Sequence, residues 1–79
     1  MRVDKFLKVS RIIKRRTIAN EACDAGRVMI NGKVVKAGAE VKICDIIEIQ
    51  FGNNTTKIEV LDLKESTKKE DAVNMYKSL

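Results

Sequence analysis

The sequence predicts a small α+β domain, in which two N-terminal helices pack on an antiparallel sheet and a helical tail follows. Three observations support this fold class. Apolar residues recur at helical spacing before Gly26, and they alternate as in strands beyond it. Asn31-Gly32 is the dipeptide most typical of a tight hairpin turn. A chain of 79 residues has room for one small domain, which we expect over residues 1–65, with the tail over 66–79.

The first expected helix covers residues 3–9. Val3, Phe6 and Leu7 fall at positions i, i+3 and i+4 and therefore share one face. Asp4 suits the first turn, where the helix dipole favours an acid.

The second expected helix covers residues 17–26. Thr17 can cap its N-terminus, and Gly26 is placed for the left-handed residue that follows a helix. We expect an apolar stripe that consists of Ile18, Ala22 and Ala25.

In the rest of the chain, apolar and polar residues alternate in short runs separated by turn signals, which is typical of an antiparallel sheet with hairpin connections. The expected strands cover residues 27–30, 33–35, 41–51 and 56–63. Phe51 continues the alternation of Ile47 and Ile49 and is expected in the core. The tail is expected to form a helix with Ser66 or Thr67 as its cap. The apolar side of that helix would consist of Ala72, Met75, Tyr76 and Leu79.

The composition argues against catalysis and against a metal centre. The chain has no His, the commonest general base, and it lacks phosphate-loop and hydrolase motifs. Cys23 and Cys44 supply at most half of a tetrahedral zinc site, so we expect both to be small buried residues with reduced thiols in the cytosol. We therefore expect no enzyme activity, no cofactor and no metal. No apolar run is long enough for a membrane span, and the N-terminus is not expected to act as a signal peptide.

Positive charge is concentrated in the first half of the chain. Residues 1–36 carry a net charge of +7 and residues 37–79 a net charge of −2. This segregation indicates a polyanionic partner, because solubility alone does not require it. Lys14, Arg15 and Arg16 stand at the start of the second helix, where unpaired N–H groups also attract phosphate. Exposed cations at that position cost stability unless a polyanion neutralises them.

The segments RVDKFLKVSR, AGRVMINGKVV and VKICDIIEI stand in an order that resembles the S4 RNA-binding domain family. The family pattern is R-x-D-K-x-L, then S-R, a G-x-V-x-V-N-G-K strand and turn, and V-x-x-G-D. The match runs from Arg2 to about Ile49. The short length, the segment KVSRIIKRRTIANEACDAGRV and the ending STKKEDAVNMYKSL are similar to one stand-alone subfamily. That subfamily acts in ribosome-associated quality control and is also described as heat-shock-like.

The resemblance implies an S4-like fold and a cytoplasmic, non-enzymatic factor. Such a factor binds the large ribosomal subunit that carries an obstructing peptidyl-tRNA, and it contacts both rRNA and tRNA. It supports a quality control factor that elongates the stalled nascent chain without a template, and a monomer is expected off the ribosome. Carried over to this sequence, the RNA-binding residues are Arg2, Lys5, Ser10, Arg11, Lys14, Arg15, Arg16, Arg27, Asn31 and Lys33.

The expected mode of binding is recognition of RNA shape. Aromatic residues make up 4% of the chain, which disfavours stacking on single-stranded bases. Phosphates and 2′-hydroxyls of folded RNA are then the expected contacts, and affinity should fall steeply with salt. The sequence departs from the family at Cys44, where the pattern has Gly. If that position needs a positive φ, Cys44 strains the turn.

Three other functions stay open at this level. The chain could serve as a rescue or assembly factor for free large subunits or pre-ribosomal RNA. It could be a detached module for an RNA-modifying enzyme such as a pseudouridine synthase, although that needs a separate catalytic chain. The tail could dock a protein partner through Met75, Tyr76 and Leu79. For the tail we favour packing on the domain, because small domains need the buried area.

Overall fold

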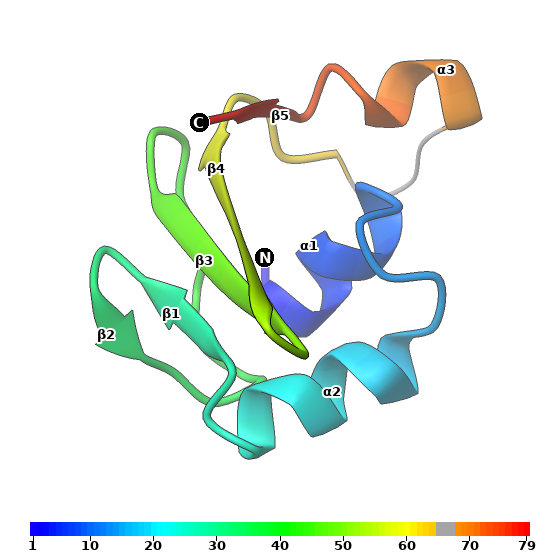
Figure 1. Cartoon of the computed structure of the whole chain (residues 1–79). Coiled ribbons are helices and arrows are strands. Elements are labelled where there is room, and N and C mark those ends of the chain that lie inside the picture. Colours follow the sequence, from blue (N-terminus) through cyan, green and yellow to red (C-terminus); the bar gives the residue numbers. More distant parts are fainter. Residues whose placement is uncertain (65–67) are drawn as a thin grey trace.

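The computed structural model describes residues 1–64 and 68–79 and confirms the expected α+β fold (Figure 1). All pairs of neighbouring strands are antiparallel, in the sheet order β2-β1-β3-β4-β5. Helices α1 and α2 lie on the same side of this sheet (Figure 1). The elements in chain order are α1 (Val3–Val9), α2 (Arg16–Asp24), β1 (Val28–Ile30), β2 (Lys33–Val34), β3 (Ile46–Phe51), β4 (Asn54–Val60), α3 (Lys69–Ala72) and β5 (Tyr76–Ser78).

The core lies between the two helices and the sheet. Val3, Phe6 and Leu7 of α1 are fully buried, as their helical spacing predicts. The alternating residues of β3 and β4 close the core from the sheet side. Those residues are Ile47, Ile49, Ile58 and Val60.

Helix α2 differs from the expectation in its start and in its buried face. The prediction that Thr17 caps it is wrong, because the N-cap is Arg15 and makes no side-chain cap hydrogen bond. The predicted apolar stripe is also wrong, since Ile18 is 49% exposed. The core side instead consists of Ala19 and Cys23, one turn apart. Small residues on this face allow α2 to pack closely on the rest of the core.

The end of α2 and the hairpin that follows the next strand are confirmed. Gly26 has a φ of 77°. The N–H of Gly26 donates to the carbonyl oxygen of Cys23, and the N–H of Arg27 donates to the carbonyl oxygen of Ala22. This pair of bonds is the Schellman pattern of helix termination. Asn31 and Gly32 have φ values of 52° and 83°, as a type I′ turn between β1 and β2 requires.

Two predictions about buried residues in the second half need correction. Cys44, expected to be buried like Cys23, is exposed, because it lies in a turn outside the core. Phe51, expected in the core, is 42% exposed. It is the last residue of β3 and pairs with Asn54 across the tight turn, at the far end of the hairpin from the buried Ile47. The alternation of apolar residues along β3 predicts the correct face of the sheet for Phe51, but the core does not extend to that end of the strand.

The C-terminal tail contains much less helix than expected. Helix α3 is a single turn at Lys69–Ala72, and Tyr76–Ser78 form an edge strand that pairs with β4. The proposed caps, Ser66 and Thr67, lie outside the described residues. The unpaired edge of β4 explains the difference, because its backbone groups need partners and β5 supplies them. Ala72 and Met75 are buried, so the tail packs on the domain.

Candidate nucleic-acid interface

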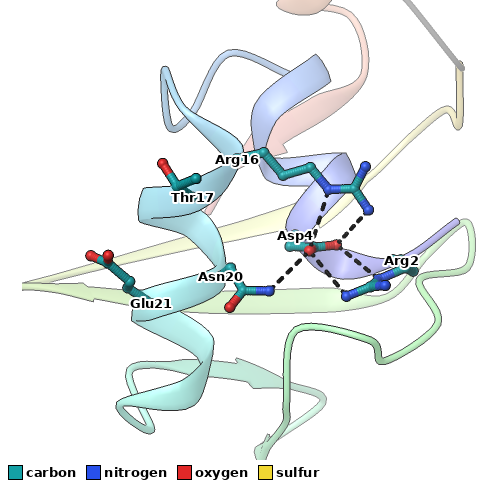
Figure 2. A pocket seen from close by; sticks show the side chains of 6 residues that line it. All are labelled: Arg2, Asp4, Arg16, Thr17, Asn20 and Glu21. Carbon is teal, nitrogen blue, oxygen red and sulfur yellow. Dashed lines mark hydrogen bonds and ion pairs between the residues drawn. The ribbon is translucent and has the colours of Figure 1, made fainter.

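Arg2 and Arg16 meet at the carboxylate of Asp4 (Figure 2). Arg2 precedes α1, and its Nε and Nη2 lie 3.2 and 3.3 Å from the two carboxylate oxygens. Arg16 is the first residue of α2, and its Nε and Nη2 lie 3.3 and 3.5 Å from the same two oxygens. Two forked guanidinium groups from different helices therefore share one carboxylate.

Asp4 itself is buried and fully hydrogen-bonded. Its side chain is 2% exposed. Besides the two arginines, Nδ2 of Asn20 donates to Oδ2 at 3.4 Å and the backbone N–H of Lys5 donates to Oδ1 at 2.8 Å. Burial alone raises the pKa of this carboxyl, but the hydrogen bonds from Arg16, Asn20 and Lys5 and the charge of Arg16 outweigh it. The pKa of Asp4 therefore lies below its ordinary value.

This arrangement leaves a net positive charge and free donors at the surface. The side chains of Arg2 and Arg16 are 49% and 45% exposed, whereas Asp4 is almost fully covered. Each guanidinium has five N–H groups, of which the fork uses two. The remaining donors are available to an incoming anion. Asp4 holds both arginines in place, so less side-chain entropy is lost when that anion binds.

A shallow depression of about 480 Å³ lies over this cluster. Figure 2 shows its lining: the guanidinium groups of Arg2 and Arg16 and the amide of Asn20 point toward Asp4, while Thr17 and Glu21 lie on the other side of Asn20. Among residues 1–64 and 68–79, no group of three or more carboxylates and thiols could hold a metal ion. The depression is lined by polar and charged groups, two of which are guanidinium groups of a shape that suits phosphate oxygens.

Other predicted cations lie on α1 or on the segment between α1 and α2. Lys14 and Arg15 are exposed, and Arg15 directly precedes the first turn of α2. Arg11 is exposed and has a left-handed φ of 62° in the tight turn after α1. Lys5 is half-buried within α1. Lys14 and Arg15 thus extend the positive charge from Arg16 back along the chain.

Arg27 and Lys33 form a second, separate group. Both side chains are exposed, but Arg27 follows the C-terminal end of α2 and Lys33 lies on β2. A helix of nine residues separates Arg16 from that end, which corresponds to about 14 Å. A long polyanion can reach both groups, whereas a single phosphate cannot.

The two uncharged members of the predicted set take structural positions. Ser10 is buried, and its hydroxyl donates to the carbonyl oxygen of Leu7 at the end of α1. The side chain of Asn31 donates to Asp45 at 3.1 Å and accepts from the N–H of Ile46 at 3.0 Å. Asn31 thus ties the hairpin turn to the start of β3. Neither side chain takes part in the cluster around Asp4.

Sequence reasoning missed the two residues that organise the cluster. Asp4 looked like a favourable first-turn acid, and Asn20 drew no attention. A usable signal was present: an acid at the start of α1 and a polar residue on the same side of α2 as Ala19 and Cys23. Residues in such positions face the neighbouring helix, so they need polar partners there.

Cys44 occupies a turn that favours glycine. Its φ is 77°, and the N–H of Asp45 donates to the carbonyl of Lys42 at 3.1 Å, as in a type II turn. The position thus has the positive φ under which Cys44 is expected to strain the turn. The side chain of Asp45 accepts from the N–H of Lys42 at 2.8 Å and from Asn31, which holds the turn in spite of the strain.

Comparison with known proteins supports one family for most of the chain. Residues 1–47 match the model of the S4 domain. The "RQC P-site tRNA stabilizing factor" of Streptococcus pneumoniae is 55% identical over 76 residues, which cover 96% of this chain and 86% of that protein. The protein with the same name in Bacillus subtilis is 54% identical, with 96% and 88% covered.

The solved structures agree with this similarity. The trimeric structure of Vibrio cholerae heat shock protein 15 has a TM-score of 0.92 and 25% identity, and the match covers 100% of this chain and 81% of the other. A heat shock protein 15 homolog of Aeromonas salmonicida is 31% identical and matches over 86% of this chain and 52% of its own length. In residues 1–64 and 68–79, no helix combines the length and the apolar character that crossing a membrane requires.

Proposed function

This chain belongs to the S4 domain family and, within it, to the proteins named RQC P-site tRNA stabilizing factors, and from this premise we propose its function. It is a non-enzymatic, cytoplasmic factor that binds RNA of the large ribosomal subunit together with a P-site tRNA. It acts on subunits that still carry an obstructing peptidyl-tRNA. In this role it contacts both rRNA and tRNA and keeps the tRNA in place.

The paired arginines at Asp4 are the observation that carries the proposal. Two exposed guanidinium groups, held from different helices by one buried carboxylate, suit the oxygens of an RNA backbone. The neighbouring Lys14 and Arg15 add charge without needing to move far. Arg27 and Lys33, beyond the other end of α2, suit a second stretch of the same backbone or a second RNA.

The proposal includes the partner that uses the held tRNA. A stabilised peptidyl-tRNA on a separated subunit is a substrate for template-free elongation of the nascent chain. We therefore include a nascent-chain-elongating quality control factor among the partners, with this chain as the component that positions the tRNA. The free protein is a monomer under the same proposal, which light scattering of the purified chain can measure.

Co-sedimentation with purified large subunits that carry a P-site tRNA tests the proposal. Arg16→Ala and Arg15→Ala should both reduce the amount of protein that pellets with the subunits. Lys57→Ala is the matched control, because Lys57 is an exposed cation of β4 that pairs with Glu48 and is far in sequence from the cluster. A circular dichroism melt of each variant separates loss of binding from loss of fold.

The two variants make the outcome decisive. Arg16 also pairs with Asp4, so its removal affects stability as well, whereas Arg15 is exposed and makes no side-chain cap. Normal pelleting of both variants, or an equal loss in Lys57→Ala, would contradict the proposal.

The similarity to heat shock protein 15 favours a second candidate function. In that case the chain binds free large subunits or pre-ribosomal RNA as a rescue or assembly factor. The two functions differ in whether the subunit carries a tRNA. Isolation of the endogenous complex and probing for tRNA separates them, because only the first function requires tRNA in every particle.

A further inference from the structure

An acidic side chain stands in the depression that the arginines make positive. Glu21 is exposed on α2, one turn after Thr17, and both line the depression with Arg2 and Arg16. Among the described residues, the Glu21 side chain has no hydrogen bond and no ion pair. A carboxylate without a cation partner repels phosphate, so a surface for phosphate alone would be better without it.

The chemistry of a carboxylate restricts what Glu21 can bind. An ionised carboxylate only accepts hydrogen bonds, and the phosphodiester backbone offers no donor. The ribose 2′-hydroxyl is the one donor that an RNA backbone has and a DNA backbone lacks. The shallow groove of an RNA helix presents 2′-hydroxyls beside phosphates, so a protein that contacts this groove needs both kinds of partner.

In the depression, the groups that can donate to a phosphate and the groups that can accept from a 2′-hydroxyl lie in different places. In Figure 2 the guanidinium groups of Arg2 and Arg16 lie on one side of Asn20, and Thr17 and Glu21 lie on the other. The amide of Asn20 is bonded to Asp4 and so belongs to the arginine side. Thr17 does not cap α2, which leaves its hydroxyl at the surface to assist Glu21.

From this geometry we infer that Glu21, with Thr17, accepts a ribose 2′-hydroxyl while Arg2 and Arg16 bind a neighbouring phosphate. Glu21 is thus the residue by which this surface distinguishes RNA from DNA. The inference deepens the proposed function and rests on it, because it concerns the same RNA-binding surface.

Anisotropy with two labelled hairpins of the same sequence, one RNA and one DNA, tests the inference. The measured quantity is the ratio of the DNA Kd to the RNA Kd. The wild-type chain should prefer RNA, and Glu21→Ala should lower the ratio about ten- to a hundredfold, the worth of one hydrogen bond to a charged group. Part of this loss should come from tighter DNA binding, since a repulsive charge is removed. Glu21→Gln should retain an intermediate ratio, because its amide oxygen still accepts, and Thr17→Val should lower the ratio less.

Asp24→Ala is the matched control. Asp24 is an exposed acid on the same helix that does not line the depression, so its removal changes the net charge equally. It should tighten RNA and DNA binding alike and leave the ratio unchanged. A wild-type ratio near one, an unchanged ratio in Glu21→Ala, or an equal change in Asp24→Ala would overturn the inference.

Pelleting of the same proteins with large subunits separates this inference from the proposed function. If the wild-type chain pellets with subunits and Glu21→Ala keeps the RNA preference, only the role of Glu21 is wrong. If the wild-type chain fails to pellet, the proposed function is wrong as well.

Discussion

Arg16 donates through Nε to Oδ2 of Asp4 across 3.3 Å, although twelve positions separate the two residues in the chain. The contact fixes the first residue of α2 to the first turn of α1. The ion pair therefore holds the two helices together and at the same time orients a guanidinium group that we propose to bind RNA. The same residue that we assign to RNA binding also helps to define how the helices pack.

Asp4→Asn should lower the free energy of unfolding at pH 7 by about 1–3 kcal/mol, because a buried carboxylate that accepts from four residues loses its charge. The pKa of Asp4 is lowered in the folded chain, so folding favours the ionised form. This stability is present above the ordinary Asp pKa and is lost as the pH falls through the folded value. Urea titrations from pH 7 to pH 2 should therefore show the gap between wild type and variant closing. A constant gap, or an equal cost for the exposed Asp24→Asn, would contradict the assignment.

Cys44→Gly should raise the free energy of unfolding by about 0.5–1 kcal/mol. A left-handed residue with a β-carbon costs about 1–2 kcal/mol, and the added chain entropy of glycine offsets part of the gain. Chemical denaturation measures the change. Cys44→Ala is the control, since it removes the thiol and keeps the β-carbon at a φ of 77°. A stabilised alanine variant would show that the thiol, and not the backbone, is responsible.

Met75→Ala should destabilise the domain by about 2–5 kcal/mol, because Met75 is fully buried beside β5 and its loss leaves a cavity. Leu79→Ala serves as control, since Leu79 is 58% exposed at the chain end. Thermal melts of both variants give the comparison. Equal, small effects would mean that the tail contributes little to the fold and is available for docking.

The two thiols should differ in reactivity. Burial, together with the charges of Asp4 and Asp24, raises the pKa of Cys23 to about 11, and its side chain is shielded from solvent. Cys44 is exposed. At pH 8 a disulfide reagent should modify one thiol in the native chain and both in denaturant. Cys44→Ser should abolish the native reaction, and a fast native reaction in that variant would contradict the buried position of Cys23.

Binding to large subunits should weaken steeply between about 50 and 200 mM monovalent salt, because neutralised phosphates release counterions. Arg15→Ala should reduce the slope of log K against log salt by about one. Lys57→Ala should leave the slope unchanged. Pelleting at several salt concentrations measures both, and identical slopes in all three proteins would place Arg15 outside the interface.

Much of the fold was predictable because the signals are local. The burial of Phe6 and Leu7 follows from their helical spacing, and Gly26 and Asn31-Gly32 ended elements where backbone geometry requires them. The family pattern marked Cys44 as a position where a positive φ would cause strain, and only the structure showed that φ. The errors fall where a distant partner decides, as at Ile18, whose face of α2 depends on how the helix packs.

The tail illustrates the limit most clearly. Residues 72, 75, 76 and 79 have helical spacing, yet Tyr76–Ser78 form a strand because β4 offers an unpaired edge. No local pattern can report that edge. Whether the segment follows its helical spacing or pairs with β4 is decided only when the whole sheet is present.

By itself, the sequence determined the α+β order of elements and the concentration of positive charge in residues 1–36, from which a polyanionic partner is expected. The charge does not distinguish RNA from other polyanions, and RNA is expected from the resemblance to the S4 family. The tertiary structure alone decided which cations act together. Arg2 and Arg16 converge because buried Asp4 needs partners, while Arg27 and Lys33 lie beyond the other end of α2. The reason is physical: charge and periodicity are properties of short segments, whereas the pairing of a buried carboxylate depends on residues that only folding brings within 3.5 Å.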